Sequence, residues 1–359
     1  MPIKTLVVDD TILYRKLASD VLKSFDEIDV VYTASNGELA LKKMQLNPID
    51  LVLCDVYMPQ KNGVETLAEI KQKYPDTLVV MMSGISTRSA NITIKALEMG
   101  AIDFIQKPDL STVEENIIKL KNDIKSVLRL AKIKLATRGL TGKPARITPK
   151  PVITQKPKIS TSRIPKTFGI LTMGVSTGGP EALNHLLQAL PSNFPVPIVM
   201  VQHMPPKFTQ SLAESLNRKC SLQVIEASDG TLLESGYVYI APGGYHMTLL
   251  EKNSSVVVKI NDGPPENSCK PAVDVLFRSV ANVFGDNDKG ILAIVLTGMG
   301  NDGLNGVRTM KRKGCFCITQ SESSCVVYGM PKAIDQAELS DLSIPLQQIA
   351  PEICRKFNV

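Results

Sequence analysis

Short apolar runs alternate with amphipathic stretches along the beginning of the chain. Strands are predicted at Ile3–Val8, Asp29–Ala34, Ile49–Cys54, Thr77–Met82 and Asp103–Gln106. The stretch Ile12–Phe25 between the first two strands repeats apolar residues at helical spacing. Strands that alternate with helices predict βαβ units, so we expect an α/β domain of (βα)5 type with a parallel sheet.

The second half of the chain repeats this alternation. Strands are predicted at Phe168–Met173, Val196–Val201, Ile291–Thr297 and Cys315–Thr319. Pro180 stands at a plausible first helical position, and leucines follow it at helical spacing. We therefore expect a second α/β domain, doubly wound around a mainly parallel sheet.

Residues 135–166 follow neither pattern. They contain five prolines and eight basic residues without an acidic one. This composition predicts a flexible, extended and self-repelling linker. The predicted organisation is a first domain over residues 1–134, the basic linker over residues 135–166, and a second domain over residues 167–359.

The net charge of +6 is concentrated in this linker. Removing its eight basic residues from the total of 41 leaves 33, against 35 acidic residues in the chain. The two folded domains are therefore slightly acidic. A basic groove for nucleic acid is not expected.

Composition also indicates the compartment. The longest apolar runs, such as 291–296, have the length of a buried strand and fall short of a membrane span. Asp9 and Asp10 interrupt the region where a secretory signal needs apolar residues. The seven cysteines are scattered, and Cys315 and Cys317 lack a second pair at zinc-like spacing. We expect a cytoplasmic protein without membrane insertion, disulfides or a structural metal cluster.

Polar residues follow several strands of the first domain. Asp9 and Asp10 end the first strand and Asp55 follows the third, and these strands are neighbours in the flavodoxin-like order 2-1-3-4-5. Ser83 and Lys107 end two further strands at the same edge. Three carboxylates need a cation, and oxygen ligands suit Mg²⁺. The set predicts a site that accepts a phosphoryl group on Asp55, although each residue alone could be a helix cap or turn residue.

Four motifs of this domain resemble the signature of two-component receiver domains: VVDD at 7–10, CDVYMP at 54–59, MSG at 82–84 and GAIDFIQKP at 100–108. The resemblance implies phosphorylation of Asp55 by a histidine kinase. It also implies that Asp10, Asp55 and the backbone carbonyl of Tyr57 bind Mg²⁺, with Asp9 acting through water.

The same resemblance implies that Ser83 and Phe104 form a switch pair. Tyr57 stands where related sequences often carry a glutamate. Only its backbone carbonyl is expected to touch the metal, so this departure concerns the lifetime of the phosphoryl group and leaves phosphorylation itself in place.

A glycine-rich segment, Gly174–Pro180, joins a predicted strand to a predicted helix. Its glycines permit a tight turn that projects Ser176. Amides at the start of the helix, such as that of Thr177, could receive a developing oxyanion. A turn of this kind can also hold a phosphate, so the motif alone leaves both interpretations open.

A nucleophilic serine needs a base, and the chain has three histidines. His185 lies within the helix predicted after Ser176, and His246 lies at a loop edge that could line the site. His203 ends a buried strand at the edge where Ser176 emerges, which makes it the best candidate. Asp302 follows another strand and could orient the imidazole, or it could simply cap a helix. Three such residues on one sheet edge favour a catalytic triad.

The order Ser–His–Asp along the chain argues against the α/β-hydrolase fold, in which the order is Ser–Asp–His. The second domain instead resembles the catalytic domain of chemotaxis-type protein-glutamate methylesterases. The resemblance lies in the segments 174–180, 202–209, 241–247, 262–265, 271–274, 297–303 and 324–331. Because those enzymes carry an N-terminal receiver, it extends over everything except the linker.

The resemblance implies hydrolysis of γ-glutamyl methyl esters on methyl-accepting chemotaxis receptors and deamidation of glutamines by the same triad. It assigns Ser176, His203 and Asp302 to that triad and the Met299 amide to the oxyanion hole. As a separate hypothesis, we expect the unphosphorylated receiver to pack across the mouth of the triad, and phosphorylation to shift this docking equilibrium. The segment 268–270 departs from the family, which often has Arg and His there, and this leaves the substrate groove open.

The sequence disfavours two other classes of protein. A transcriptional response regulator is disfavoured because the second domain has an α/β pattern and lacks a helix-turn-helix signature. A nucleotide-binding domain would use the glycine-rich turn for phosphate. It is disfavoured because the next strand ends in Gln202 and His203 rather than in an acidic residue for ribose.

Overall fold

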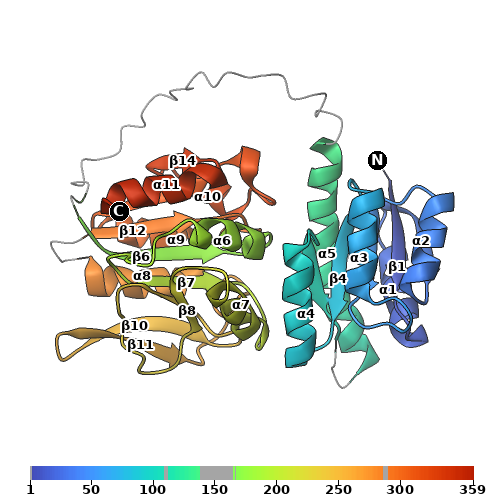
Figure 1. The fold of residues 1–359 in the computed structure, drawn as a ribbon, viewed down its shortest axis with the longest axis horizontal. Helices are drawn as coiled ribbons and strands as arrows, with labels where there is room; N and C mark the ends of the chain where they lie inside the picture. The colour runs from blue at the N-terminus through green and yellow to red at the C-terminus, as the bar shows by residue number, and fades with distance from the viewer. Residues whose placement is uncertain (1, 109–111, 138–164, 166, 286–289) are drawn as a thin grey trace. The chain divides into compact units, whose positions relative to one another are not determined.

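The computed structural model describes residues 2–108, 112–137, 165, 167–285 and 290–359 (Figure 1). The chain forms two compact units, one within residues 1–156 and one within residues 157–359. Most of the predicted linker, residues 138–164 and 166, lies outside the described residues.

The first unit is a five-stranded parallel sheet in the order β2-β1-β3-β4-β5. Its strands are β1 (Ile3–Val8), β2 (Ile28–Ala34), β3 (Leu51–Asp55), β4 (Leu78–Ser83) and β5 (Asp103–Gln106). The helices between and after them are α1 (Ile12–Lys23), α2 (Gly37–Leu46), α3 (Gly63–Lys73), α4 (Thr87–Glu98) and α5 (Val113–Thr137). The predicted (βα)5 fold and its strand order are confirmed.

Side-chain caps explain where the helices of this unit begin. The side chain of Asn36 accepts a hydrogen bond from the Leu39 amide at the start of α2. Asn62 and Glu65 form a reciprocal capping box at α3. Helix α5 continues through Thr137, past the predicted end of the first domain at residue 134.

The second unit contains a seven-stranded parallel sheet in the order β14-β13-β12-β6-β7-β9-β8. These strands are β6 (Phe168–Val175), β7 (Ile198–Gln202), β8 (Gln223–Glu226), β9 (Tyr237–Ile240), β12 (Gly290–Val295), β13 (Cys315–Gln320) and β14 (Leu342–Ile344). An antiparallel pair, β10 (His246–Lys252) and β11 (Ser255–Asn261), forms a separate ribbon. The predicted parallel α/β architecture is confirmed.

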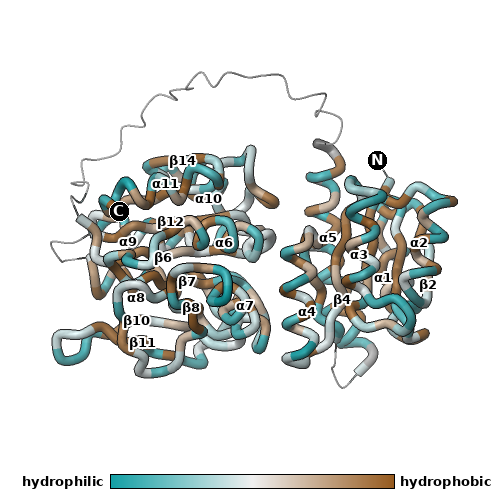
Figure 2. Tube along the Cα trace, viewed as in Figure 1, coloured by the Kyte–Doolittle hydropathy of each residue, from teal (hydrophilic) through white to brown (hydrophobic). Residues whose placement is uncertain are grey.

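Helices pack on both faces of this sheet, and its central strands β6, β7 and β12 are buried at every residue but Gly169. These strands are largely hydrophobic (Figure 2). One group comprises α6 (Gly179–Gln188), α7 (Phe208–Asn217) and α11 (Leu346–Phe357), and α6 packs against both others. Another comprises α8 (Val273–Phe284), which packs on β6, β7 and β12, and α9 (Leu304–Lys311), with α10 (Met330–Gln336) against α9. Among the described residues, no helix has the length and apolar character needed to cross a bilayer.

The position of β6 defines where a site can form. It lies between β7 on one side and β12 on the other, although β7 follows it in sequence and β12 comes much later. The chain therefore reverses its direction of winding at β6, and the loops after β6, β7 and β12 diverge at their carboxyl ends. Ligands bind in such crevices of parallel sheets.

Candidate phosphoacceptor pocket and candidate active site

The first unit brings its acidic residues to one sheet edge. Asp9 follows β1 and Asp55 ends β3, and both carboxylates are buried. Lys107, which follows β5, places Nζ 2.7 Å from Asp9 Oδ2 and 2.7 Å from Asp55 Oδ2. Asp10 is exposed beside them, and one carboxylate oxygen from each of the three acids lies within 4.8 Å of the others. The predicted carboxylates and the lysine thus share one pocket.

The charges of this pocket are strongly coupled. Burial raises the pKa of Asp55 to about 6, although the neighbouring ammonium of Lys107 opposes that rise. Burial would lower the pKa of Lys107, but the carboxylates of Asp55 and Asp9 outweigh it and the pKa is raised. An excess of carboxylates at a sheet edge is a donor set that fits Mg²⁺.

The two residues expected to switch lie on adjacent strands. Ser83 ends β4 and is fully buried, and its hydroxyl accepts a hydrogen bond of 2.8 Å from Thr93 in α4. Phe104 lies in β5 and is half-buried. The ring of Tyr57 lies below the guanidinium of Arg88 at 5.5 Å, so this residue packs against α4 rather than adding a charge to the pocket.

In the second unit, Ser176 directly follows β6 within a tight turn. The Gly179 amide donates to the Ser176 carbonyl at 2.8 Å, and Gly178 between them has a φ of 79°. This is the geometry of a type II turn, which requires a residue at positive φ. A Cβ on Gly178 would also lie 2.5 Å from the side chain of Val326. The glycine therefore permits Ser176 to stand at the start of α6.

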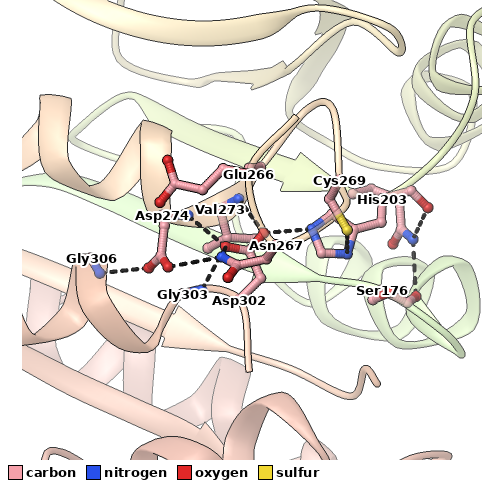
Figure 3. Close-up of polar contacts among 12 residues, drawn as sticks. Ser176, His203, Glu266, Asn267, Cys269, Val273, Asp274, Asp302, Gly303 and Gly306 are labelled. Atoms are coloured by element: carbon pink, nitrogen blue, oxygen red, sulfur yellow. Dashed lines mark hydrogen bonds and ion pairs between the residues drawn. The ribbon is translucent and has the colours of Figure 1, made fainter. Parts of the chain in front are cut away.

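His203 stands beside this turn. It follows β7, and its amide donates to the Val175 carbonyl at 3.1 Å, so the register of the sheet puts it next to Ser176. The side chain of Gln202 donates to the Ser176 carbonyl at 2.9 Å and joins the two loops. Figure 3 shows Ser176, His203 and Asp302 at this edge of the sheet. Asp302, after β12, places Oδ2 2.8 Å from His203 Nε2.

The Asp302 carboxylate is buried and receives several hydrogen bonds. The amides of Val273 and Asp274, the first residues of α8, donate to it at 2.7 and 3.0 Å, and the Gly303 amide donates at 2.9 Å. Asp302 therefore also caps a helix, as the sequence allowed. The capped helix is α8, however, and not α9, which follows Asp302 in sequence. A negative charge at a helix N-terminus is stabilised by the unpaired amides.

These contacts determine the ionisation of His203 and Asp302. Burial would lower the pKa of His203, but hydrogen bonds to Asp302 and to the Cys269 sulfur outweigh it and raise that pKa to about 9. Burial would raise the pKa of Asp302, but His203 and the α8 amides outweigh it and the pKa is lowered. The carboxylate therefore stays ionised and stabilises an imidazolium.

A tight turn at residues 266–269, which was not predicted from the sequence, completes the surroundings of His203 and Asp302. Glu266 and Cys269 exchange backbone hydrogen bonds of 3.1 and 2.9 Å, and Asn267 and Ser268 between them have φ of 53° and 62°. The side-chain amide of Asn267 donates to Asp302 Oδ1 at 2.9 Å and to Asp274 Oδ2 at 3.0 Å. The only sequence signal for this turn was the departure from the family pattern at residues 268–270.

The loop after β12 lies against the serine. A Cβ on Gly298 would come within 2.7 Å of Ser176 Cβ, so a side chain at that position would displace the serine. The Thr297 hydroxyl donates to the Thr177 carbonyl at 3.0 Å and joins both loops. Among the described residues, the backbone amides of Thr177 and Met299 donate to no acceptor, as amides of an oxyanion hole require.

The other two histidines lie elsewhere. His185 is exposed in α6. His246 is the first residue of β10 and is buried, with Nδ1 accepting from the Ala272 amide at 3.2 Å and Nε2 3.0 Å from the Pro264 carbonyl. His246 thus stands where a loop meets β10, and its hydrogen bond to the Ala272 amide holds the segment before α8 in place.

One contact expected of a triad is missing in the described chain, where no hydrogen bond joins the Ser176 hydroxyl to His203. Since Nε2 faces Asp302, Nδ1 remains for the serine, and the Cys269 sulfur now lies 3.6 Å from it. Catalytic hydrogen bonds often tighten only when substrate binds. Proton transfer therefore requires the serine side chain to approach Nδ1.

The side-chain amide of Asn267 bridges two carboxylates, those of Asp302 and Asp274, and should therefore stabilise this unit. Asn267→Asp should lower the stability of this unit by about 1–3 kcal/mol, because a third carboxylate would face Asp302 and Asp274. The matched control is Asn267→Gly, which removes the amide and retains the positive φ. The difference in melting temperature between the variants, measured by calorimetry, should be larger at pH 8 than at pH 5, since protonation of the new carboxyl relieves the repulsion. A difference in melting temperature between the two variants that is the same at pH 8 and pH 5 would contradict the predicted repulsion.

Together the fold and the two pockets define a class of protein: a receiver followed by a parallel α/β domain with a serine turn and a His–Asp pair at its switch point. Residues 5–118 match the model of the response regulator receiver domain, and residues 171–353 match that of the CheB methylesterase. The chain belongs to the CheB methylesterase family, and the resemblance inferred from its motifs is confirmed.

Individual relatives extend over the whole chain. A protein-glutamate methylesterase/protein-glutamine glutaminase of Desulfotalea psychrophila is 44% identical over 357 residues, which cover 98% of this chain and 97% of the relative. One of Trichodesmium erythraeum is 40% identical and covers 99% of both chains. The structure is similar to that of the Thermotoga maritima CheB methylesterase catalytic domain, with a TM-score of 0.51, 39% identity, and 53% of this chain and 98% of that chain covered.

Proposed function

We propose that this chain hydrolyses γ-glutamyl methyl esters on methyl-accepting chemotaxis receptors, and deamidates glutamines there, under the control of phosphorylation at Asp55. The observation that carries the proposal is the pair of His203 and Asp302, joined at 2.8 Å beside the Ser176 turn at the switch point of a parallel sheet. The family membership and the names of the full-length relatives support the substrate.

In the proposed reaction, His203 Nδ1 takes the proton of the Ser176 hydroxyl while Oγ attacks the ester carbonyl. The amides of Met299 and Thr177 receive the negative charge on the carbonyl oxygen. Methanol then leaves with the proton from His203, or ammonia leaves when the substrate is glutamine. Water attacks the acyl-enzyme with the same base and releases the glutamate. Asp302 orients the imidazole and stabilises its charged form.

In the receiver, Asp55 would accept the phosphoryl group from a histidine kinase. Asp10, Asp55 and the Tyr57 carbonyl would hold Mg²⁺, with Asp9 acting through water, and the ion would offset charge on the transferring oxygens. Lys107, already 2.7 Å from Asp55 Oδ2, is placed to contact the phosphoryl oxygens. Movement of Ser83 toward them would release Thr93 and change the surface at α4, with Phe104 turning inward.

We also propose that the protein acts in the cytoplasm, where kinase and receptor substrates would meet it. The cysteines support this proposal, because all seven are free and free thiols persist in reducing compartments. The deciding experiment for the function is methanol release from methylated receptor, measured with and without a small-molecule phosphodonor. Release that depends on the chain and rises with the phosphodonor is expected.

Asp55→Asn should keep the basal rate of methanol release and lose its stimulation by phosphodonor and Mg²⁺. An amide forms no acyl phosphate and is a poorer ligand for the metal. The rate is measured for both proteins with and without phosphodonor, and Asp20→Asn, on α1, serves as the matched control that remains stimulated. If Asp55→Asn were stimulated as strongly as the unchanged protein, another residue would be the phosphoacceptor.

A further inference from the structure

The active-site turn carries a cysteine that the proposed esterase reaction does not use. Cys269 is half-buried, and its sulfur lies 3.6 Å from His203 Nδ1 (Figure 3). One ligand atom from each of His203, Cys269 and Asp302 lies within 4.8 Å of the others. Imidazole, thiolate and carboxylate are the ligand types of zinc sites. We propose that His203 Nδ1 and the Cys269 sulfur bind Zn²⁺, with Asp302 orienting the imidazole, and that the bound ion inhibits the esterase, an inference that rests on the proposed role of His203.

The distance between His203 Nδ1 and Cys269 Sγ fits a zinc ion bound to both atoms. Zinc lies about 2.0–2.1 Å from a histidine nitrogen and about 2.3 Å from a thiolate, so a tetrahedral site holds these atoms about 3.5 Å apart. The observed distance is 3.6 Å. An ion can therefore enter between His203 and Cys269 with little movement of either residue. The thiol proton and the proton on His203 Nδ1 both pass to solvent as it binds.

Asp302 supports such a site from behind the imidazole. Histidines that bind a metal through one ring nitrogen commonly donate the other N–H to a carboxylate. His203 Nε2 already lies 2.8 Å from Asp302 Oδ2, which fixes the ring with Nδ1 toward Cys269. The same carboxylate that orients the proposed base would thus orient it as a metal ligand.

The turn that carries Cys269 is held firmly, which favours a preformed site. Glu266, at its other end, forms a bidentate ion pair with Arg278 of α8 at 2.7 and 2.5 Å. Lys270 is paired with Asp262. Both neighbouring cations are therefore balanced by carboxylates, which reduces their repulsion of a divalent ion. Asn267 and Ser268 are exposed, so the ion can enter from solvent.

Binding there would stop the proposed reaction for a simple reason. Nδ1 is the nitrogen that must take the proton from Ser176, and a zinc ion occupies its lone pair. The ion and the reaction are mutually exclusive, so inhibition should be reversed by a chelator. The inhibition needs no phosphorylation, because every group involved lies in the second unit.

The test uses the full chain without phosphodonor. Methanol release is measured over a series of buffered free Zn²⁺ concentrations, for the unchanged protein, Cys269→Ser and the control Cys220→Ser, another half-buried cysteine. Each rate is compared with the metal-free rate of the same protein. Loss of a partner that only orients a ligand costs about 10- to 100-fold in metal affinity. Cys269→Ser, which removes a ligand, should raise the inhibitory concentration at least ~10-fold, and Cys220→Ser should not change it.

A second measurement detects the ion independently of esterase activity. Co²⁺, added in the presence of excess Mg²⁺ to occupy the receiver, should give a thiolate-to-metal absorption band in the unchanged protein and in Cys220→Ser, and none in Cys269→Ser. A band that persists in Cys269→Ser, or inhibition by Zn²⁺ that is equal in all three proteins, overturns the site. A band without inhibition overturns the inhibitory role. The proposed function itself is tested separately by removing Ser176.

Discussion

Ser176→Ala should reduce methanol release from methylated receptor by roughly 10⁴- to 10⁶-fold, and His203→Ala should do the same, because members of a triad act as a unit. The serine variant should remain folded. Within the described residues its hydroxyl makes no hydrogen bond, while its backbone carbonyl accepts hydrogen bonds from the Gly179 amide and from the Gln202 side chain, which hold the turn. Melting temperature and phosphorylation of Asp55 are measured alongside the initial rate.

The exposed Ser192 provides a matched control, since it lies in the same unit after α6. Ser192→Ala should retain the full rate. Because the Cys269 sulfur lies 3.6 Å from His203 Nδ1, its thiol is an alternative nucleophile. The double variant Ser176→Ala, Cys269→Ser separates the two nucleophiles. Full activity of Ser176→Ala would disprove the serine mechanism, and activity lost only in the double variant would assign the attack to Cys269.

Asp302→Asn should leave a small residual activity, because the orienting carboxylate contributes least of the three. The structure adds an effect on stability. Each oxygen of Asp302 accepts hydrogen bonds, from His203 and Val273 on one side and from Asp274 and Gly303 on the other. An amide nitrogen would face donors at either position, so the melting temperature should fall as well. The apparent pKa of His203 in the pH profile should also fall, because burial then acts on the imidazolium without the carboxylate.

Much of the fold follows from periodicity. The strand predicted at Ile3–Val8 is observed with the same limits, and the one at Phe168–Met173 is longer by two residues and ends at Val175. Parallel strands buried on both faces produce continuous apolar runs that stand out from their helices. The ribbon of β10 and β11 was not predicted, although His246, expected at a loop edge, is the first residue of β10.

The site was predictable only in part, for a physical reason. Residues that end strands can be located from sequence, because parallel strands bring their carboxyl ends together. Asn267 and Cys269 reach the site from a turn whose conformation depends on two consecutive positive φ angles. Nothing local indicates that this turn folds onto His203 and Asp302. Likewise, the amides that hold Asp302 belong to α8, whose N-terminus is distant in sequence.

A fragment of residues 167–359 should release methanol faster than the unphosphorylated full chain. The fragment contains Ser176, His203, Asp302 and the turn at 266–269, so it lacks no group of the proposed reaction. It should also fold alone, since the second unit is compact and the Thermotoga maritima structure that it resembles is that of a catalytic domain. Any inhibition by the receiver must then arise from contact between the two domains.

The expected size of this effect follows from the nature of such contacts. Interfaces between domains of one chain are modest in area and adjustable, and the prolines and basic residues at 135–166 predict a linker that does not fix the two domains. A coupling of roughly 1–3 kcal/mol would make the fragment about 5- to 150-fold faster. Initial rates on methylated receptor are compared without phosphodonor, with circular dichroism to establish folding. A folded fragment that is slower than the full chain would mean that the receiver contributes contacts to the substrate, and the inhibitory model would be wrong.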